Sequence, residues 1–372
     1  MIQLWILMAL ALGLGWVYEH VYVGTPNRTL DKQKISIVFI VMTLLLGGFW
    51  GLRLSYNDTH TYRVGYEAIQ RLPEFWNTFD PSLSKDPGFT LCNAILKTLG
   101  VSTQNWLMIY SLITMGLYLH FIRKNKNVLS LNIYLFFCVG AFVFTGAAIK
   151  QSIATAICLC ALSLAKEKKW IRYFLVIFLA STFHMYALIY LLVPFLMFRP
   201  WTKKTFFLII GTVIIAFSLQ HLFGAINTVT TSLGETYTAA EFSGEGVNIF
   251  RVLVCNAPVM LAVLFHKDIF KNSTRNENLM FNLSMVNGCI MFIGLFGTAN
   301  YFARLANYFV LAQAITLPWM ISKLNGKNRK IVQGLMIVGY LLFFYYDCNI
   351  VYGAFAHRLK RLTMWEYLNQ LF

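Results

Sequence analysis

The chain alternates between long apolar runs and short polar segments. The run ISIVFIVMTLLLGGFWGL at residues 35–52 is continuous in its hydrophobicity and shows no strict alternation. A continuous run of about 20 apolar residues is typical of a membrane-spanning helix, whereas segments of about ten alternating residues are typical of a transmembrane β-barrel. The pattern therefore predicts an all-α, polytopic integral membrane protein.

We expect about 11 to 12 transmembrane or re-entrant helices, forming a single transmembrane domain over residues 1–372. The interval 171–198 fits either one long helix or two short helices that meet near His184, and the second interpretation keeps the flanking basic clusters on one side of the membrane. The other expected helices lie at about 2–18, 35–52, 105–122, 128–145, 147–165, 205–223, 249–266, 279–296, 300–322 and 331–346.

The longest polar interval follows the second expected helix and covers residues 53–104. From Arg53 to Phe89 it reads RLSYNDTHTYRVGYEAIQRLPEFWNTFDPSLSKDPGF, in which acids, bases and aromatic residues are interleaved. We interpret it as a large extracytoplasmic loop that ends in a possible amphipathic or re-entrant helix at 88–99. Residues 224–248 form a second, smaller polar loop.

Composition and charge support a membrane protein and set its orientation. The chain is 58% hydrophobic and only 12% charged, against about 25% charged residues in soluble domains. Its net charge of +16 indicates no nucleic-acid partner, because most Lys and Arg residues fall in short loops, as the positive-inside rule requires of cytoplasmic segments. These basic loops lie at 24–34, 123–127, 166–172, 199–204, 266–275 and 323–330.

This orientation places the N-terminus, residues 53–104 and residues 224–248 outside the cytoplasm. The tail at 357–372 is then also outside, although its basic residues break the positive-inside rule. The first helix lacks a preceding basic segment, so we expect it to be retained and not cleaved as a signal peptide. The seven cysteines show no metal-type spacing and are expected to be small apolar core residues.

Several ionisable residues are expected at the outer ends of the helices. Placing such residues within or at the edge of a membrane costs free energy, so they indicate a functional site by default. A cluster of cations on the side away from the basic loops suggests a membrane-borne anion such as a lipid diphosphate. The members of this group are Arg53, Asp58, Asp86, Lys150, His184, Arg251 and Arg304.

Five of these members also have a purely structural interpretation. Arg53 and Arg304 could extend their side chains to the interface, and His184 could be a core histidine. Asp58 could cap a helix that starts at the next residue, and Asp86, followed by Pro and Gly, could only form a turn.

The order of five short elements resembles the EpsG family of bacterial membrane proteins, which groups with the Wzy-type polysaccharide polymerases. The elements are GLRLSYNDTHTYRVGY, DPGFTLCNAILKTLG, IKQSIATAICLCALSLA, LASTFHMYALIYLL and ARLANYF. The chain departs from the family at Lys150, where the family usually has Arg, so the charge is kept but the two-pronged guanidinium is not.

The resemblance implies a glycosyltransferase that joins undecaprenyl-diphosphate-linked oligosaccharide units on the outer face of the bacterial cytoplasmic membrane, for an exopolysaccharide, a capsule or an O-antigen. It further implies a chain-length regulator and a flippase as partners. We expect no cofactor and a metal-independent reaction. The expected roles are acid–base catalysis by Asp58, His184 and Asp86, diphosphate binding by Arg53, Lys150, Arg251 and Arg304, and sugar binding or positioning by Tyr62, Gln151 and Tyr308.

Two other functions stay open at this point. A different polyprenyl-lipid-dependent glycosyltransferase could use an early loop aspartate, and Asp58 fits that role. A lipid-linked glycan transporter or flippase should show charges near the middle of the membrane and broken helices in corresponding halves of the chain.

Overall fold

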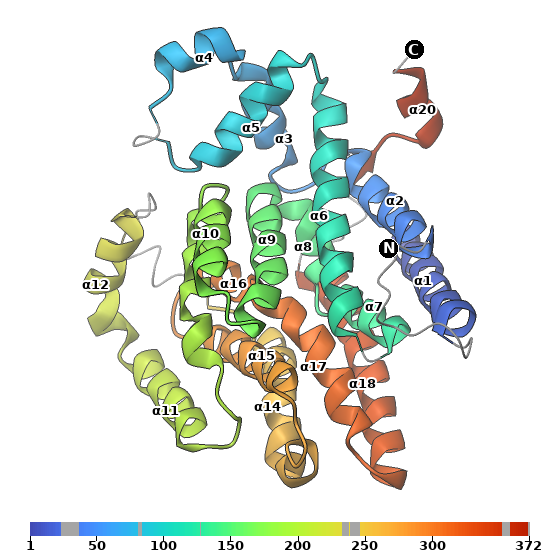
Figure 1. Cartoon of the computed structure of the whole chain (residues 1–372), viewed down its shortest axis with the longest axis vertical. Helices are drawn as coiled ribbons and strands as arrows, with labels where there is room; N and C mark the ends of the chain where they lie inside the picture. Colours follow the sequence, from blue (N-terminus) through green and yellow to red (C-terminus); the bar gives the residue numbers. More distant parts are fainter. Residues whose placement is uncertain are drawn as a thin grey trace. The chain divides into compact units, whose positions relative to one another are not determined.

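The computed structural model describes residues 1–23, 37–80, 84–126, 128–232, 238, 246–351 and 358–370. Over these residues the chain is almost entirely helical, as the sequence predicts (Figure 1). Five helices in this part of the chain are long and apolar enough to cross a membrane, and the number rises to eight if each of three bent helix pairs is one span. Three apolar helices are shorter, namely Ile37–Gly51, Trp170–Ser181 and Met185–Leu196. The protein is therefore an all-α, polytopic membrane protein.

The helices group into two compact units. The first unit contains residues 1–164, 169–188 and 345–372, and the second contains residues 165–168 and 189–344. The elements of the first unit are α1 (Ile2–Val17), η1 (Tyr18–Val23), α2 (Ile37–Gly51), β1 (Arg53–Ser55), α3 (Thr59–Ala68), α4 (Leu72–Thr78), α5 (Pro87–Thr98), α6 (Thr103–Asn125), α7 (Leu129–Cys138), α8 (Ala141–Ala147), α9 (Ile149–Lys166), α10 (Trp170–Ser181), η3 (Asp347–Val351), β2 (Lys360–Arg361) and α20 (Met364–Asn369).

Close packing of α2 on α6 forms the centre of the first unit. Gly47 and Gly51 lie four residues apart on one face of α2, and a Cβ atom at Gly51 would lie 2.9 Å from the Cα of Met108 on α6. Small residues at this spacing let two helix backbones approach closely. In a membrane, such close van der Waals packing drives helix association, because the hydrophobic effect does not. The side chain of Gln104 then donates to the carbonyl oxygen of Gly51 at 2.7 Å, which satisfies the end of α2.

The first unit has two chemically distinct ends. At one end, Glu19 accepts hydrogen bonds from Ser130, and the ammonium of Lys126 lies 5.1 Å from the ring centre of Tyr18. At the other end, α3, α4 and α5 gather above α6, α9 and α10 (Figure 1). The long polar interval 53–104 is therefore helical over most of its described length, and the expected amphipathic helix at 88–99 is present as α5.

A small antiparallel sheet ties the C-terminal segment to this second end. β1 and β2 pair with Arg53 opposite Arg361 and Ser55 opposite Lys360. The backbone N–H of Leu362 extends the pairing by donating to the carbonyl oxygen of Leu52 at 2.9 Å. The segment after β2 and the start of the polar interval therefore lie on the same side of the membrane.

The second unit is built from bent helices whose exposed carbonyl groups are satisfied by side chains. Pro258 inside α14 has no N–H, so the carbonyl of Val254, four residues earlier, loses its helical partner. Gln313 and Tyr340 donate to that oxygen from two neighbouring helices. The elements of this unit are the second half of η2 (Met185–Leu196), α11 (Lys203–Phe217), α12 (Leu219–Ser232), α14 (Ile249–Ile269), α15 (Arg275–Ile293), α16 (Ala299–Asn307), α17 (Val310–Ser322) and α18 (Gly326–Tyr346).

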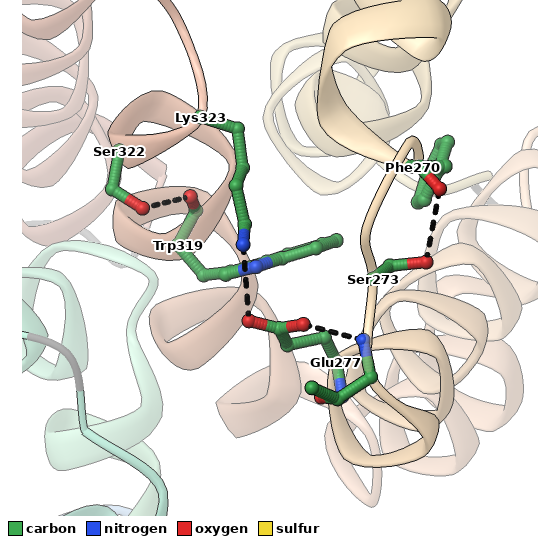
Figure 2. Close-up of polar contacts among 7 residues, drawn as sticks. Phe270, Ser273, Glu277, Trp319, Ser322 and Lys323 are labelled. Carbon is green, nitrogen blue, oxygen red and sulfur yellow. Dashed lines mark hydrogen bonds and ion pairs between the residues drawn. The ribbon is translucent and has the colours of Figure 1, made fainter.

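One end of the second unit is joined by an ion pair and an aromatic contact. Lys323 at the end of α17 lies 3.6 Å from Glu277 in the first turn of α15, and the same ammonium lies over the ring of Trp319 (Figure 2). Glu277 also accepts from the backbone N–H of Thr274, so it caps α15 while it holds Lys323. The two basic segments at 266–275 and 323–330 therefore meet at one end of this unit.

Some expected helix boundaries need correction. The interval 171–198 consists of two helices with a break at Thr182–His184, as favoured. The expected helix at 128–145 is bent by 53° between α7 and α8, and the one at 300–322 is bent by 54° between α16 and α17. Helix α12 continues to Ser232, so the beginning of the expected 224–248 loop is helical, and most of the remainder lies outside the described residues, as does the basic segment 24–34.

Candidate functional site

The candidate site of the first unit is centred on an ion pair between Asp86 and Lys150. The ammonium of Lys150 lies 2.8 Å from Oδ2 of Asp86. The side chain of Asp86 is 6% exposed and that of Lys150 is 31% exposed. Asp86 stands at the position that caps α5, yet its side chain makes no capping hydrogen bond. The carboxylate therefore points away from its own helix. It pairs with an ammonium that comes from α9 and is partly exposed to solvent.

The loop that carries Asp86 is docked on the segment that carries His184. The backbone N–H groups of Gly88 and Phe89 donate to the carbonyl oxygen of Thr182, at 2.9 and 3.3 Å. A Cβ atom at Gly88 would lie 2.1 Å from Oγ1 of Thr182, so only glycine fits this approach. His184 is half-buried two residues later, with its ring 5.4 Å from that of Tyr186. The break in the 171–198 interval thus provides the docking site for the Asp-Pro-Gly-Phe element.

An aromatic cluster packs against the ion pair. The ammonium of Lys150 lies 5.3 Å from the ring centre of Phe89, a distance that permits a cation–π contact. Phe89 is buried against Trp106 and Tyr110. Asn93 accepts hydrogen bonds from both the indole N–H of Trp106 and the hydroxyl of Tyr110, at 2.8 and 3.1 Å. These bonds fix α5 on α6, and they hold the floor of the site rigid.

Tyr62 and Gln151, both expected to bind or position sugar, have different environments. Tyr62 is half-buried on α3, with its ring 6.3 Å from that of Phe89 and at 66° to it. The structure therefore brings Tyr62 to the edge of the ion-pair site. Gln151 directly follows Lys150 on α9 but is only 2% exposed. Its side chain belongs to the interior of the first unit.

Arg53 lies inside the protein. It is 1% exposed, its Nε donates to the hydroxyl of Thr59, and its Nη1 donates to the carbonyl oxygen of Trp50 and the hydroxyl of Ser111. Burial is the main reason that the pKa of Arg53 falls to about 9, with Arg63 lowering and Tyr62 raising it. The guanidinium thus links the end of α2, the start of α3 and the middle of α6. The expected contact between Arg53 and a diphosphate stays a prediction.

Asp58 lies on the surface next to this buried arginine. It precedes α3, but its side chain makes no capping hydrogen bond, and it is exposed. The preceding residue, Asn57, has a φ of 41°, a left-handed conformation that asparagine tolerates better than most residues. The turn therefore presents the Asp58 carboxylate outward, and the carboxylate does not act as a helix cap.

The remaining predicted residues belong to the second unit. Arg251 is half-buried in the first turn of α14, after a cap in which Asn248 accepts from the N–H of Phe250. Arg304 is half-buried in the last turn of α16. Tyr308 is fully buried, and its carbonyl oxygen, at the bend between α16 and α17, accepts from the hydroxyl of Tyr190 at 2.8 Å. Tyr308 therefore supports a helix bend in the core of this unit.

Sequence reasoning missed two features of the first unit. The contact between Thr182 and Gly88 has no local signal, because it joins distant segments. Asp347 is an acid inside the apolar run FFYYDCNIV, which is a recognisable signal, and it is 7% exposed. Its Oδ2 lies 3.9 Å from the Cβ position of Gly140, the residue with φ of 80° that separates α7 from α8. A buried carboxylate therefore lies beside a broken helix.

The partly exposed ammonium makes the arrangement around Asp86 suited to an anionic ligand. It offers a partly exposed ammonium and an aromatic floor, and the docked Thr182 segment continues to a half-buried histidine. Among the described residues, no group of three or more His, Cys, Asp or Glu side chains is placed to hold a metal ion. An ammonium fixed by a carboxylate is a preorganised group for stabilising negative charge on a phosphate oxygen.

The fold defines a polytopic membrane protein, and the ion pair of Asp86 and Lys150 lies at one end of its first unit. The sequence model of the EpsG family matches residues 36–363, nearly the whole chain, and the protein belongs to that family. The match includes Asp58, Asp86, Lys150, His184 and Arg304. No curated protein and no solved structure matches the chain.

Proposed function

We propose that this protein is a polysaccharide polymerase that joins undecaprenyl-diphosphate-linked oligosaccharide units on the outer face of the bacterial cytoplasmic membrane. Membership of the EpsG family supports a polymerase-like membrane protein. The observation that carries the proposal is the pair of Asp86 and Lys150, in which a buried carboxylate holds a partly exposed ammonium at 2.8 Å.

In the proposed reaction, a hydroxyl oxygen of the incoming lipid-linked unit attacks the anomeric carbon of the growing glycan. The bond from that carbon to the diphosphate oxygen breaks, and the electron pair leaves with the diphosphate. Lys150 stabilises this developing charge, because its ammonium is already oriented and needs no reorganisation. Asp86 positions Lys150. Its carboxylate is 6% exposed and occupied by that ammonium, so it is a poorer candidate for proton transfer than an exposed group.

The proton of the attacking hydroxyl needs a base, and Asp58 and His184 are the two candidates. Asp58 is exposed and makes no capping hydrogen bond, so a sugar hydroxyl can approach it. His184 follows the docked Thr182 segment and is half-buried. The proximity of Tyr62 to Phe89, with ring centroids 6.3 Å apart, supports a role for Tyr62 in contacting a sugar ring. Arg53 stabilises the turn that presents Asp58 through its bond to Thr59.

A cellular experiment tests the proposal. Deletion of the gene should remove long surface glycan chains on a gel while single lipid-linked repeat units remain. Complementation with Lys150→Gln should fail to restore long chains. The matched control is Lys124→Gln, which changes an exposed lysine at the far end of α6 and should restore them. Loss of every lipid-linked unit on deletion would place the protein at an earlier step and would contradict the proposal.

The bent helices favour one alternative, a lipid-linked glycan transporter. Broken helices are common at transporter sites, and the first unit has the α7–α8 bend beside Asp347 while the second has the α16–α17 bend. A transporter would move the lipid-linked unit without lengthening it. Deletion would then leave the lipid-linked units on the cytoplasmic face, where an impermeant lectin or periodate cannot reach them, and this result separates the two functions.

A further inference from the structure

The C-terminal segment 358–370, called here the tail segment, is fixed to the first unit at both of its ends. At its start, β2 pairs with β1 and the N–H of Leu362 donates to the carbonyl oxygen of Leu52. At its far end, the hydroxyl of Tyr367 donates to Oδ1 of Asn105 at 2.7 Å. Helix α20, which carries Tyr367, lies close to α2 and the upper end of α6 (Figure 1). The tail segment therefore has a defined position.

That position is the end of two apolar helices. The guanidinium of Arg361 lies 4.0 Å from the ring centre of Phe49, in the last turns of α2, and its Nη1 lies 3.5 Å from Oε1 of Gln3. Gln3 is in the first turn of α1, and the stretch Ile2–His20 is long and apolar enough to cross a membrane. A helix end of this kind lies at the boundary between hydrocarbon and headgroups. The tail segment is thus held at the level of the membrane surface.

Helix α20 exposes an apolar face at this level. Met364, Trp365 and Leu368 are 54%, 72% and 41% exposed, and at about 100° per residue they fall on one arc of the helix. Tyr367, about 110° around the helix from the centre of this arc, anchors α20 to α6. Tryptophan is enriched at membrane–water interfaces, where its apolar ring and polar N–H meet both environments. The first turns of α1, whose Gln3 contacts Arg361, also expose the apolar residues Ile2 and Ile6, at 76% and 56%.

The tail segment also carries uncompensated positive charge. Arg358 and Lys360 are exposed, and in the part of the chain described here neither forms an ion pair with a carboxylate. Glu366, the one acid within α20, is used locally, because it accepts from the backbone N–H and hydroxyl of Thr363 in a capping box. These hydrogen bonds lower the pKa of Glu366. Cations beside an exposed apolar face form the pattern of helices that bind anionic lipid surfaces.

We propose that the tail segment is an interfacial anchor that binds anionic phospholipid headgroups through Arg358 and Lys360 and inserts Trp365 at the acyl boundary. Through the β1–β2 pairing, the anchor holds the start of the 53–104 interval at the membrane surface. The proposal goes beyond the polymerase function and does not depend on it. It also gives a reason for basic residues on a side of the membrane where the positive-inside rule disfavours them.

Tryptophan fluorescence of the full-length protein in lipid nanodiscs tests the insertion. The difference between wild type and Trp365→Phe isolates the emission of Trp365. This emission should be quenched by brominated phospholipids and protected from iodide. The matched control adds Gln370→Trp in the Trp365→Phe background, which places an indole on the opposite side of α20. The introduced indole should be quenched by iodide and not by brominated lipid. Iodide quenching of Trp365 as strong as that of the control overturns the proposal.

A second measurement tests the charge. In nanodiscs with phosphatidylglycerol added to phosphatidylcholine, quenching of Trp365 by brominated lipid should increase. The pair of changes Arg358→Gln and Lys360→Gln should remove at least roughly half of that increase, because each basic residue near an anionic surface contributes to binding. The control pair Arg329→Gln and Lys330→Gln, exposed at the start of α18, should leave it unchanged. An increase that survives the first pair in full contradicts headgroup binding. Glycan chain length is scored separately, so failure of the anchor and failure of the polymerase are distinguishable.

Discussion

Asp86 and Lys150, which lie 64 residues apart in the chain, form a 2.8 Å ion pair in which the acid is buried and the base is partly exposed. The carboxylate is therefore held inside the protein, and the ammonium is the partner that a ligand can contact. Asp86 and Lys150 come together because α5 docks on α6 and on the Thr182 segment. The predictions below separate residues that hold this geometry from residues that use it.

Gly88→Ala should disturb the site through packing alone. The new methyl group would lie 2.1 Å from the Thr182 hydroxyl oxygen, so the loop must shift, at a cost of about 1–3 kcal/mol in the free energy of unfolding. The midpoint of thermal unfolding of the purified protein measures this cost. Gly65→Ala on α3, where no atom lies within 4 Å of the new methyl group, is the matched control. Equal midpoints for the two variants would show that the close approach is absent.

Arg53→Lys should lower stability more than it changes substrate affinity. A lysine cannot reproduce the separate hydrogen bonds of Nε and Nη1 to Thr59, Trp50 and Ser111, and leaving these acceptors unpaired costs about 1–3 kcal/mol. Thermal unfolding and the KM for the lipid-linked unit are measured on the same preparation. If stability is unchanged while KM rises, Arg53 contacts the diphosphate directly and our structural assignment is wrong.

The amide of Gln313 should be needed because Pro258 is present. Gln313→Leu removes a donor to the carbonyl oxygen of Val254, and a buried acceptor that loses a partner costs about 1–3 kcal/mol. In the background of Pro258→Ala, the backbone N–H of residue 258 is restored and can donate to the same oxygen. The loss in unfolding free energy caused by Gln313→Leu should then be less than about half of its value in the wild-type background. A double-mutant cycle of unfolding free energies gives the coupling. Strict additivity would refute the link between the two residues.

The tail segment and the loop before α5 should be labelled from the same side of the membrane. β1 and β2 are hydrogen-bonded strands, so no bilayer can separate them. Cysteines introduced by Lys85→Cys and Gln370→Cys should both react with an impermeant thiol reagent added outside intact spheroplasts. Lys124→Cys should react only after lysis, and the seven native cysteines give the background in wild-type protein. Opposite labelling of positions 85 and 370 is incompatible with the sheet.

The sequence predicts those parts of the fold that depend on local pattern. The all-α membrane fold and the helix at 88–99 follow from the pattern of apolar and polar residues, the break near His184 follows from the basic clusters that flank the interval 171–198, and the structure has all three. The bend at Gly140 lies within an apolar run, so periodicity cannot reveal it, and the polar residues Arg304 and Asn307 before Val310 do not by themselves indicate a bend. The burial of Arg53 is equally invisible, because a charge at a helix end looks the same whether it faces lipid, water or a hydroxyl cluster.

The site itself is predicted by residue type but not by pairing. Asp86 and Lys150 stand out as charges at the ends of apolar runs, yet their contact depends on how α5 docks against α6 and on the segment after α10. Thr182 gives no signal, because its backbone carbonyl and not its side-chain chemistry receives Gly88 and Phe89. Long-range hydrogen bonds of the backbone leave no trace in composition or spacing.

The most direct test of the central claim is polymerisation by the purified protein in liposomes loaded with the undecaprenyl-diphosphate-linked repeat unit. The wild type should convert single units into a ladder of longer lipid-linked chains and release undecaprenyl diphosphate. Lys150→Gln should lower the rate by about 10²–10³-fold, the range seen when one preorganised group that stabilises developing charge is removed. Lys150→Arg should retain most of the rate and Lys124→Gln all of it. A ladder formed at the wild-type rate by Lys150→Gln would contradict the account.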